Sequence, residues 1–421
     1  MKILLRNAFI KDPESEFFGS KKDILIAGDI ISEIADRIDE NSDREIDLTG
    51  KWVTPAFFDM SAHFNDPGKE HKEDINSGIA AAMAGGFSQV CLLPNTDPVT
   101  DHKGQVEYII SRSMRQTGEV IPLGSVTVGA KGDQMAEIMD LYNAGAIAFT
   151  DGVHPIVNSE VLFKALQYVQ KFDGMIINRP CDPYLAAYGQ MHEGVRSTEL
   201  GMKGIPSLAE ELMLQRDLSI LEYAGGRIHF SCISSKEGVE LIKEAKEKGL
   251  QVTCDVAIHN LLWTDEQTVD FDTNFKVQPP LRSSEDRKAL IEGVNSGAID
   301  VIVSDHQPQD EESKKLEFDQ AKFGMISLQT LFSGLLSIKE ELSFDQAVSA
   351  LTHHPRKLLK QNDFTIAKGQ KASLGLFDPE EEWVFDGSAN RSKSGNSPFF
   401  GQKLTGRSVG LIHKGRLFQS E

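Results

Sequence analysis

The sequence predicts an α/β protein in which eight parallel strands close into a barrel, with a small β domain beside it. Short apolar runs, bounded by Gly, Pro, Asn or Asp, alternate with longer amphipathic stretches, and eight such units follow one another. The two ends of the chain instead alternate polar and apolar residues, as half-buried strands do. A chain of 421 residues is long enough to build both parts around buried cores.

The strand candidates are each too short for a helix. They comprise residues 52–60, 89–94, 120–126, 146–149, 174–178, 227–233, 251–256 and 299–304. Between them lie stretches with helical periodicity, of which 235–249 is the clearest, because its apolar residues fall on one face and Gly249 stands in the C-cap position. Residues 207–221 and 284–294 follow the same pattern. Strands that alternate with helices predict a parallel sheet, and eight units predict a TIM barrel.

The ends of the chain predict a second, composite domain. Residues 1–50 alternate like β-strands, and the tail after the last barrel helix repeats this character. We predict that residues 1–52 and 360–421 together form a β-sandwich domain. Residues 53–359 then form the TIM-barrel domain.

Composition excludes several kinds of partner. Lys and Arg number 44 and Asp and Glu 63, which gives a net charge of −19 that repels phosphate backbones and anionic lipid. No apolar run approaches the roughly 18 residues of a membrane span, and the N-terminus lacks the pattern of a signal peptide. Four cysteines are too few for a disulfide framework. We therefore expect a cytoplasmic protein with no nucleic-acid or membrane partner.

Candidate functional residues follow from the barrel, because chemistry in this fold lies at the carboxyl ends of the strands. Asp59, Ser61 and His63 alternate along the end of the first strand and share one face. Three further polar residues come at the ends of the second, fourth and eighth strands: Asn95, Asp151 and Asp305. An imidazole and two carboxylates at one mouth are candidate ligands for a divalent ion, and an ordinary polar lining is the alternative.

A family resemblance appears at this mouth. The run Asp59-Met-Ser-Ala-His63-Phe-Asn-Asp-Pro-Gly68 resembles the dihydroorotase signature Asp-x-His-x-His-x-Arg-x-Pro-Gly. The resemblance runs from about residue 20 to the end, and many ordered motifs make it far more specific than one match. The further matching motifs are Pro94-Asn-Thr-Asp-Pro98, Ala148-Phe-Thr-Asp151, Gly204-Ile-Pro-Ser-Leu-Ala-Glu210, Pro279-Pro-Leu-Arg282, Ser304-Asp-His306 and Ser397-Pro-Phe-Phe-Gly401.

The resemblance implies a chemistry and a set of roles. The family carries out the zinc-dependent cyclisation of N-carbamoyl-aspartate to dihydroorotate, and the reverse ring opening, in pyrimidine synthesis. By resemblance, His63, Asp151 and Asp305 occupy metal positions, and Asp305 is also the catalytic residue that moves the proton. The substrate positions fall on Asn65, Asn95 and Gln309.

The chain departs from the family where the chemistry lies. Ser61, Arg179 and Cys232 stand where the family has metal-binding histidines. A hydroxyl is a weak zinc ligand, and a guanidinium cannot be one, although Cys232 as a thiolate is an alternative ligand. We expect Arg179 to replace the metal as the counter-charge to the carboxylates of Asp151 and Asp305.

The substrate positions depart as well. Asn65 stands where the family has an arginine that grips the substrate carboxylate, and it has neither the charge nor the bidentate fork of arginine. Gln309 replaces a substrate-contacting histidine, and Gln278 replaces the asparagine before Pro-Pro-Leu-Arg. The cofactor is therefore expected to be zinc or absent.

Three functions follow from these departures. The first, which we favour, is a catalytically impaired or inactive dihydroorotase-like scaffold, a pseudoenzyme whose family precedent suggests aspartate transcarbamoylase as partner. The second is an active dihydroorotase with one zinc on His63, Asp151 and Asp305. The third is an amidohydrolase with a changed substrate, since Asn65 and Gln309 suit a substrate without the carboxylate. The family also suggests a homodimer.

Overall fold

The barrel strands lie in two parallel sheets in the computed structural model, which describes residues 1–419. The three-stranded sheet contains β6 (Phe57–Ala62), β7 (Phe87–Leu92) and β8 (Glu119–Pro122), in that order. The four-stranded sheet has the order β14 (Val301–Val303), β13 (Val252–Ala257), β12 (Ile228–Phe230) and β9 (Ile176–Asn178).

Single parallel bridges join the two sheets at both edges. Ala62 at the end of β6 bridges to His306 just after β14. On the other side Phe149 bridges both to Gly124, after β8, and to Ile176 in β9. Phe149 thus holds the fourth position of the ring, where the sequence predicts a strand over 146–149 but the structure has only bridging contacts. The predicted α/β barrel fold is confirmed.

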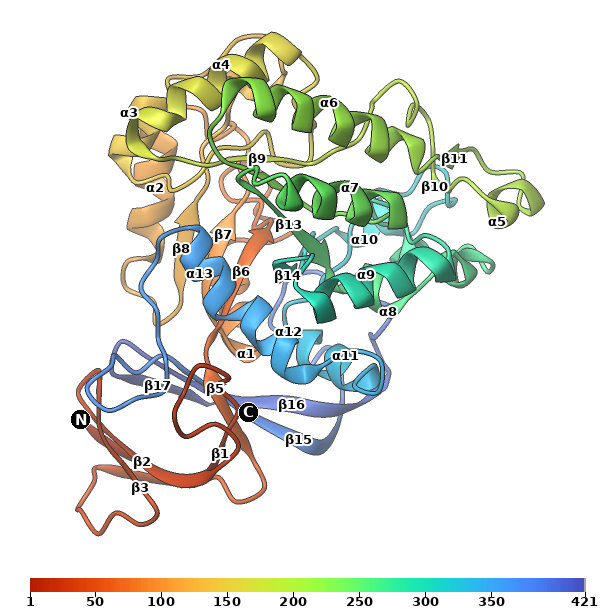
Figure 1. Cartoon of the computed structure of the whole chain (residues 1–421). Helices are drawn as coiled ribbons and strands as arrows, with labels where there is room; N and C mark the ends of the chain where they lie inside the picture. Colours follow the sequence, from red (N-terminus) through yellow and green to blue (C-terminus); the bar gives the residue numbers. More distant parts are fainter. Residues whose placement is uncertain (420–421) are drawn as a thin grey trace.

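Helices cover the outside of the barrel, as Figure 1 shows. The helix α7 (Lys236–Glu247) lies where the periodicity predicts it: the Ser235 side chain caps it by accepting from Gly238 N at 3.0 Å, and its apolar face is buried. The other α-helices are α1 (Ile75–Ala84), α2 (Lys103–Ser113), α3 (Ile138–Ala144), α4 (Ser159–Val169), α5 (Val195–Glu199), α6 (Leu208–Ala224), α8 (Ile258–Leu262), α9 (Ser284–Ser296), α10 (Glu311–Lys314), α11 (Leu331–Ser337), α12 (Phe344–Leu351) and α13 (His353–Leu358). None of the helices within residues 1–419 has the length and apolarity to cross a membrane.

The two ends of the chain meet in one eight-stranded sheet (Figure 1). The N-terminal β5 (Trp52–Pro55) pairs antiparallel with the C-terminal β15 (Leu374–Val384), so both ends contribute to a common core. The boundaries 1–52, 53–359 and 360–421 stay a prediction. The remaining strands of this sheet are β1 (Lys2–Ile10), β2 (Lys21–Ala27), β3 (Ile30–Ala35), β4 (Arg44–Asp47), β16 (Lys403–His413) and β17 (Arg416–Gln419).

One excursion leaves the barrel between β9 and α6. It contains the two-residue strands β10 (Met191–His192) and β11 (Gly204–Ile205), which pair in parallel, and the short helix α5. Figure 1 shows it on the opposite side of the molecule from the terminal sheet. Because β9 ends at Asn178, residue 179 stands at the barrel mouth, at the start of this excursion.

Candidate active site at the barrel mouth

A buried guanidinium occupies the centre of the mouth. Arg179 is 4 % exposed, and its Nη2 donates to Asp305 Oδ1 at 2.5 Å and to Cys232 Sγ at 2.8 Å. Its Nη1 donates to the carbonyl oxygen of Gln278 at 3.1 Å. The permanent positive charge of an arginine therefore lies directly against the carboxylate that the resemblance identifies as catalytic.

The environment of Asp305 keeps this pair ionised. Burial alone would raise the pKa of the Asp305 carboxyl, but the charge of Arg179 and the donors around it hold that pKa below its usual value. These donors include Gln307 Nε2, at 3.0 Å from both carboxylate oxygens, and Ser61 Oγ at 3.4 Å. Burial also raises the pKa of the Cys232 thiol well above its usual value, despite the nearby Arg179. Cys232 is thus a thiol here, and a metal ion bound to its sulfur would have to displace the proton.

Two neutral histidines flank the ion pair. Burial lowers the pKa of His63 to about 4, and the charge of Arg179 adds to this effect while Asp305 opposes it. Burial likewise lowers the pKa of His259 to about 4, and its Nε2 lies 4.0 Å from Asp305 Oδ2. Among the described residues, His63 Nε2 and both ring nitrogens of His259 are buried without a hydrogen-bond partner.

His259 is a mouth residue that the sequence analysis does not single out. A signal for it exists, because His259 follows β13 by two residues and so lies at the carboxyl end of a barrel strand. No motif of the resemblance covers this position, and position alone is a weak signal.

Asp151 is directed away from the ion pair. Its Oδ1 accepts from Ser125 Oγ at 2.8 Å and from Thr127 N at 2.9 Å, while its Oδ2 accepts from Thr127 Oγ1 at 2.6 Å. Burial raises the pKa of this carboxyl, although the same donors oppose the rise. The expectation that Arg179 balances both carboxylates therefore holds for Asp305, whereas the hydrogen bonds of Asp151 are to the segment after β8.

The predicted metal ligands do not converge. In the described part of the chain, one group of three or more His, Cys, Asp or Glu side chains places its ligand atoms within 4.8 Å of one another, and it consists of Glu14, His353 and Asp363, remote from the mouth. A tight zinc site needs three or four such ligands around one point. With Arg179 against Asp305, the residues present do not fit a zinc ion held by His63, Asp151 and Asp305, a set that stays an untested prediction.

The predicted substrate positions are bonded to the protein itself. Asn95 donates to the carbonyl oxygen of Asp151 at 3.0 Å and accepts from Val153 N at 3.0 Å. Gln309 accepts from Lys72 Nζ at 2.6 Å and donates to the carbonyl oxygen of Phe323 at 2.8 Å. These amides hold loops at the mouth together.

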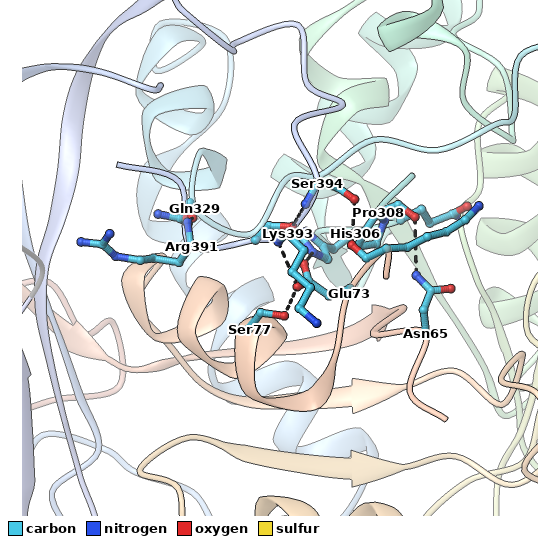
Figure 2. A network of polar contacts seen from close by, with 12 residues as sticks. Asn65, Glu73, Ser77, His306, Pro308, Gln329, Arg391, Lys393 and Ser394 are labelled. Atoms are coloured by element: carbon cyan, nitrogen blue, oxygen red, sulfur yellow. Dashed lines mark hydrogen bonds and ion pairs between the residues drawn. The ribbon is translucent and has the colours of Figure 1, made fainter. Parts of the chain in front are cut away.

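A polar network fastens the tail of the chain across one side of the mouth (Figure 2). Glu73 accepts from the Ser77 and Ser392 hydroxyls, from Lys393 N at 3.2 Å and from His306 Nε2 at 3.4 Å. Figure 2 also shows Asn65 directed towards Pro308, whose carbonyl oxygen it reaches at 3.5 Å.

The space left beside Arg179 is small. The cavity that Arg179, Cys181, Cys232 and Arg282 help to line has a volume of about 10 Å³. A water molecule needs about that volume, and pockets for small ligands measure roughly 300–1,000 Å³. A larger hollow of about 510 Å³ is lined by Gln309, Asp310 and Lys314, together with residues 393–396.

Solved structures share this architecture. An L-hydantoinase from Arthrobacter aurescens superposes with a TM-score of 0.87 at 24 % identity, covering 99 % of this chain and 96 % of that one. A D-hydantoinase superposes with a TM-score of 0.83 at 19 % identity, covering 100 % and 96 %. The chain therefore has the same fold as these hydantoinases.

Sequence comparison defines the family within that class. The family model described as dihydro-orotase-like matches residues 50–238. A dihydroorotase from Syntrophotalea carbinolica is 38 % identical over 99 % of both chains, and one from Acetivibrio thermocellus is 40 % identical over 96 % of both. The chain belongs to the dihydroorotase family.

Proposed function

We propose that this member of the dihydroorotase family is a catalytically inactive or severely impaired homologue that acts in pyrimidine biosynthesis as an assembly partner. The observation that carries the proposal is the contact of 2.5 Å between Arg179 Nη2 and Asp305 Oδ1. A carboxylate that must take up and release a proton during turnover is here held as an anion by a permanent cation.

The same contact disfavours the metal. A guanidinium and a Zn²⁺ ion about 4 Å apart would repel each other by about 8 kcal/mol at an effective dielectric constant of about 20. Metal-binding histidines would offset this repulsion. At two of the positions where the family has them, this chain has the Ser61 hydroxyl and the buried Cys232 thiol. Zinc-dependent activation of water is the chemistry that the family's metal supplies, and this set of residues does not favour it.

The assembly role carries two partner proposals. The inactive chain would associate with aspartate transcarbamoylase, and it would form a homodimer. Mixing the purified full-length chain with the transcarbamoylase from the same organism tests the first. A stoichiometric complex in sedimentation velocity is the expected result, and two independent species would remove that partner.

Metal content and turnover test the loss of catalysis. We expect less than about one tenth of a zinc per chain in protein purified without chelator, and no conversion of carbamoyl-aspartate to dihydroorotate in added zinc. A matched variant restores the histidines by Ser61→His, Arg179→His and Cys232→His, and we expect it to bind at least one zinc. Lys246→His, on the surface, is the control and should bind none.

Two outcomes would replace the proposal. About one zinc per wild-type chain together with turnover of carbamoyl-aspartate would identify an active mononuclear enzyme. Zinc-dependent hydrolysis of cyclic amides that lack the carboxylate, without turnover of dihydroorotate, would identify an amidohydrolase with a changed substrate, as Asn65 and Gln309 would allow.

A further inference from the structure

Two lysine side chains are buried around the segment that follows β14, and neither forms an ion pair within residues 1–419. Lys314, the last residue of α10, is 5 % exposed, and Lys276 is 1 % exposed. Lysines are almost never fully buried without a counter-charge, because an unpaired charge away from water is costly. The oxygens that accept from these two lysines belong to backbone carbonyl groups and to one side-chain amide.

The bonds of Lys276 use all three hydrogens of an ammonium group. Its Nζ donates to Gln190 Oε1 at 2.5 Å and to the carbonyl oxygens of Phe318 and Asp319, the second of these at 3.2 Å. The rings of Phe318 and Phe323 also lie near this nitrogen, with their centroids at 5.4 and 4.8 Å, where an aromatic ring attracts a cation. Lys276 is therefore held as a cation.

Lys314 has acceptors for two hydrogens only. Its Nζ donates to the carbonyl oxygens of Lys322 at 2.9 Å and of Gly324 at 3.0 Å, and no third acceptor lies in the described part of the chain. A neutral amine makes these two bonds and keeps a lone pair, whereas an ammonium group would leave one donor and its charge unpaired. Burial lowers the pKa of Lys314 to about 7, and the charge of Lys276 adds to this effect while Asp272 opposes it.

The Lys314 side chain forms part of the wall of the 510 Å³ cavity. The carbonyl oxygen of Gly324, which accepts from Lys314, also accepts from Asn396 Nδ2 at 3.0 Å, and Asn396 lines the same cavity. Phe400, another lining residue, is 41 % exposed, so the cavity reaches the surface. Its volume lies within the roughly 300–1,000 Å³ of pockets that hold small molecules.

Apart from Lys314, the formal charges of the cavity wall cancel. Lys315 and Lys393 are matched in number by Asp310 and Glu311, and Lys315 Nζ lies 2.6 Å from Glu311 Oε1. Figure 2 shows Lys393 beside Ser394 on the tail segment. Polar side chains and one aromatic ring form most of the remaining wall: His71, Thr273, Asn274, Ser394, Asn396 and Phe400. Hydrogen-bonding groups without a net charge favour an uncharged ligand that carries hydroxyl groups.

We propose that Lys314 is a nucleophilic amine that forms an imine with a small uncharged hydroxy-aldehyde held in this cavity. The Nζ lone pair adds to the carbonyl carbon, and an N–H proton passes to the carbonyl oxygen. The resulting carbinolamine loses its hydroxyl group and the second N–H proton as water, which leaves the C=N bond. An imine nitrogen keeps at most one N–H, so at least one of the bonds to Lys322 and Gly324 is lost on modification.

Reductive trapping on the full-length chain tests this inference, which does not depend on the proposed assembly role. The protein is incubated with glyceraldehyde and cyanoborohydride, which reduces an imine to a stable secondary amine. Cleavage after glutamate releases residues 313–317, Ser-Lys-Lys-Leu-Glu, so that tandem mass spectrometry compares both lysines on one peptide. Lys315 is the matched control, because its side chain is 73 % exposed. At about pH 7.5 we expect Lys314 to react at least about tenfold faster than Lys315.

Three further measurements sharpen the test. In concentrated guanidinium chloride the two lysines should react at equal rates, because the fold that distinguishes them is lost. Lys314→Arg, which can still donate to the two carbonyl oxygens, should leave Lys315 as the modified residue of the peptide. With glyoxylate, an anionic aldehyde, the preference for Lys314 should fall by at least about threefold, since the wall has no net charge to attract a carboxylate.

Equal rates at Lys314 and Lys315 in the folded chain would overturn the inference, and they are the result expected if Lys314 only ties the loop as an ammonium group. A preference for Lys314 that persists in denaturant would overturn it as well. An undiminished preference with glyoxylate would remove the uncharged ligand class. The metal and turnover assays of the proposed function report on the Arg179–Asp305 pair, so their outcome is separate from that of the trapping experiment.

Discussion

Two buried cations hold this molecule together in different ways. Arg179 lies at the barrel mouth against Asp305. His353, at the start of α13 and 3 % exposed, lies between the barrel and the terminal sheet. Its Nε2 lies 2.8 Å from Asp12 Oδ1 and its Nδ1 2.8 Å from Asp363 Oδ1. Since a carboxylate only accepts, both ring nitrogens must donate, and His353 is an imidazolium.

The two cations differ in whether they can lose a proton. Arginine does not lose its charge in a protein, so the Asp305 carboxylate is neutralised at every working pH. Burial lowers the pKa of His353, but Asp12 and Asp363 outweigh it and raise that pKa to about 9. The charge at the mouth is therefore permanent, whereas the contact between the terminal sheet and the barrel can be titrated.

Removing the permanent cation should have the largest effect. In Arg179→Ala the Asp305 carboxylate is left buried without its partner, and we expect a loss of about 3–5 kcal/mol of unfolding free energy. Chemical denaturation of the wild type and the variant at pH 7.5 measures it. A loss below about 1 kcal/mol would mean that solvent already reaches this pair.

The titratable cation should give a pH-dependent loss. The folded pKa of about 9 exceeds the usual histidine value of 6.5, so the stabilisation by His353 is complete below about pH 6.5, declines between the two values and is lost above about pH 9. His353→Gln should therefore cost at most about 3 kcal/mol at pH 6.

The difference in unfolding free energy between wild type and His353→Gln should shrink as the pH rises from 6 to 9.5. Denaturation at four pH values checks this, with His354→Gln as the control, because His354 bonds a backbone carbonyl oxygen, that of Asp300. A difference that is constant with pH would contradict the imidazolium assignment.

Replacing both partners at the mouth should cost less than removing one. Arg179→Met combined with Asp305→Leu removes both charges of the pair, and we expect a stability within about 1–2 kcal/mol of the wild type. The same denaturation measurement separates this variant from Arg179→Ala. Equal losses in the two would show that the hydrogen bonds of Arg179 to Cys232 and Gln278, and not its charge, stabilise the mouth.

The loss of a surface ion pair should give the smallest effect on the unfolding free energy. It is the reference against which the loss of the buried pair is compared. Lys246 Nζ lies 2.7 Å from Asp300 Oδ2, and both side chains are partly exposed, at 24 % and 21 %. Lys246→Met should cost about 1 kcal/mol or less, and the cost should fall further in 0.5 M salt. A cost close to that of Arg179→Ala would remove the distinction between the buried and the exposed pair.

The sequence by itself determined the barrel, the shared terminal sheet and the positions of the mouth residues. These follow from local rules: the period of apolar residues, helix caps such as Ser235, and the placement of polar residues at strand ends. The resemblance also singled out Arg179 as one of three residues, with Ser61 and Cys232, that stand where the family has metal-binding histidines.

The tertiary structure alone decided which of these residues meet. Arg179 and Asp305 are 126 residues apart, and their contact depends on how β9 and β14 are placed in the ring. Asp151 instead bonds Ser125 and Thr127. His259 lies at the mouth beside Asp305, a position that no motif of the sequence predicts. Local periodicity sets which side of an element is buried, but the partner of a buried side chain is set by packing between distant segments.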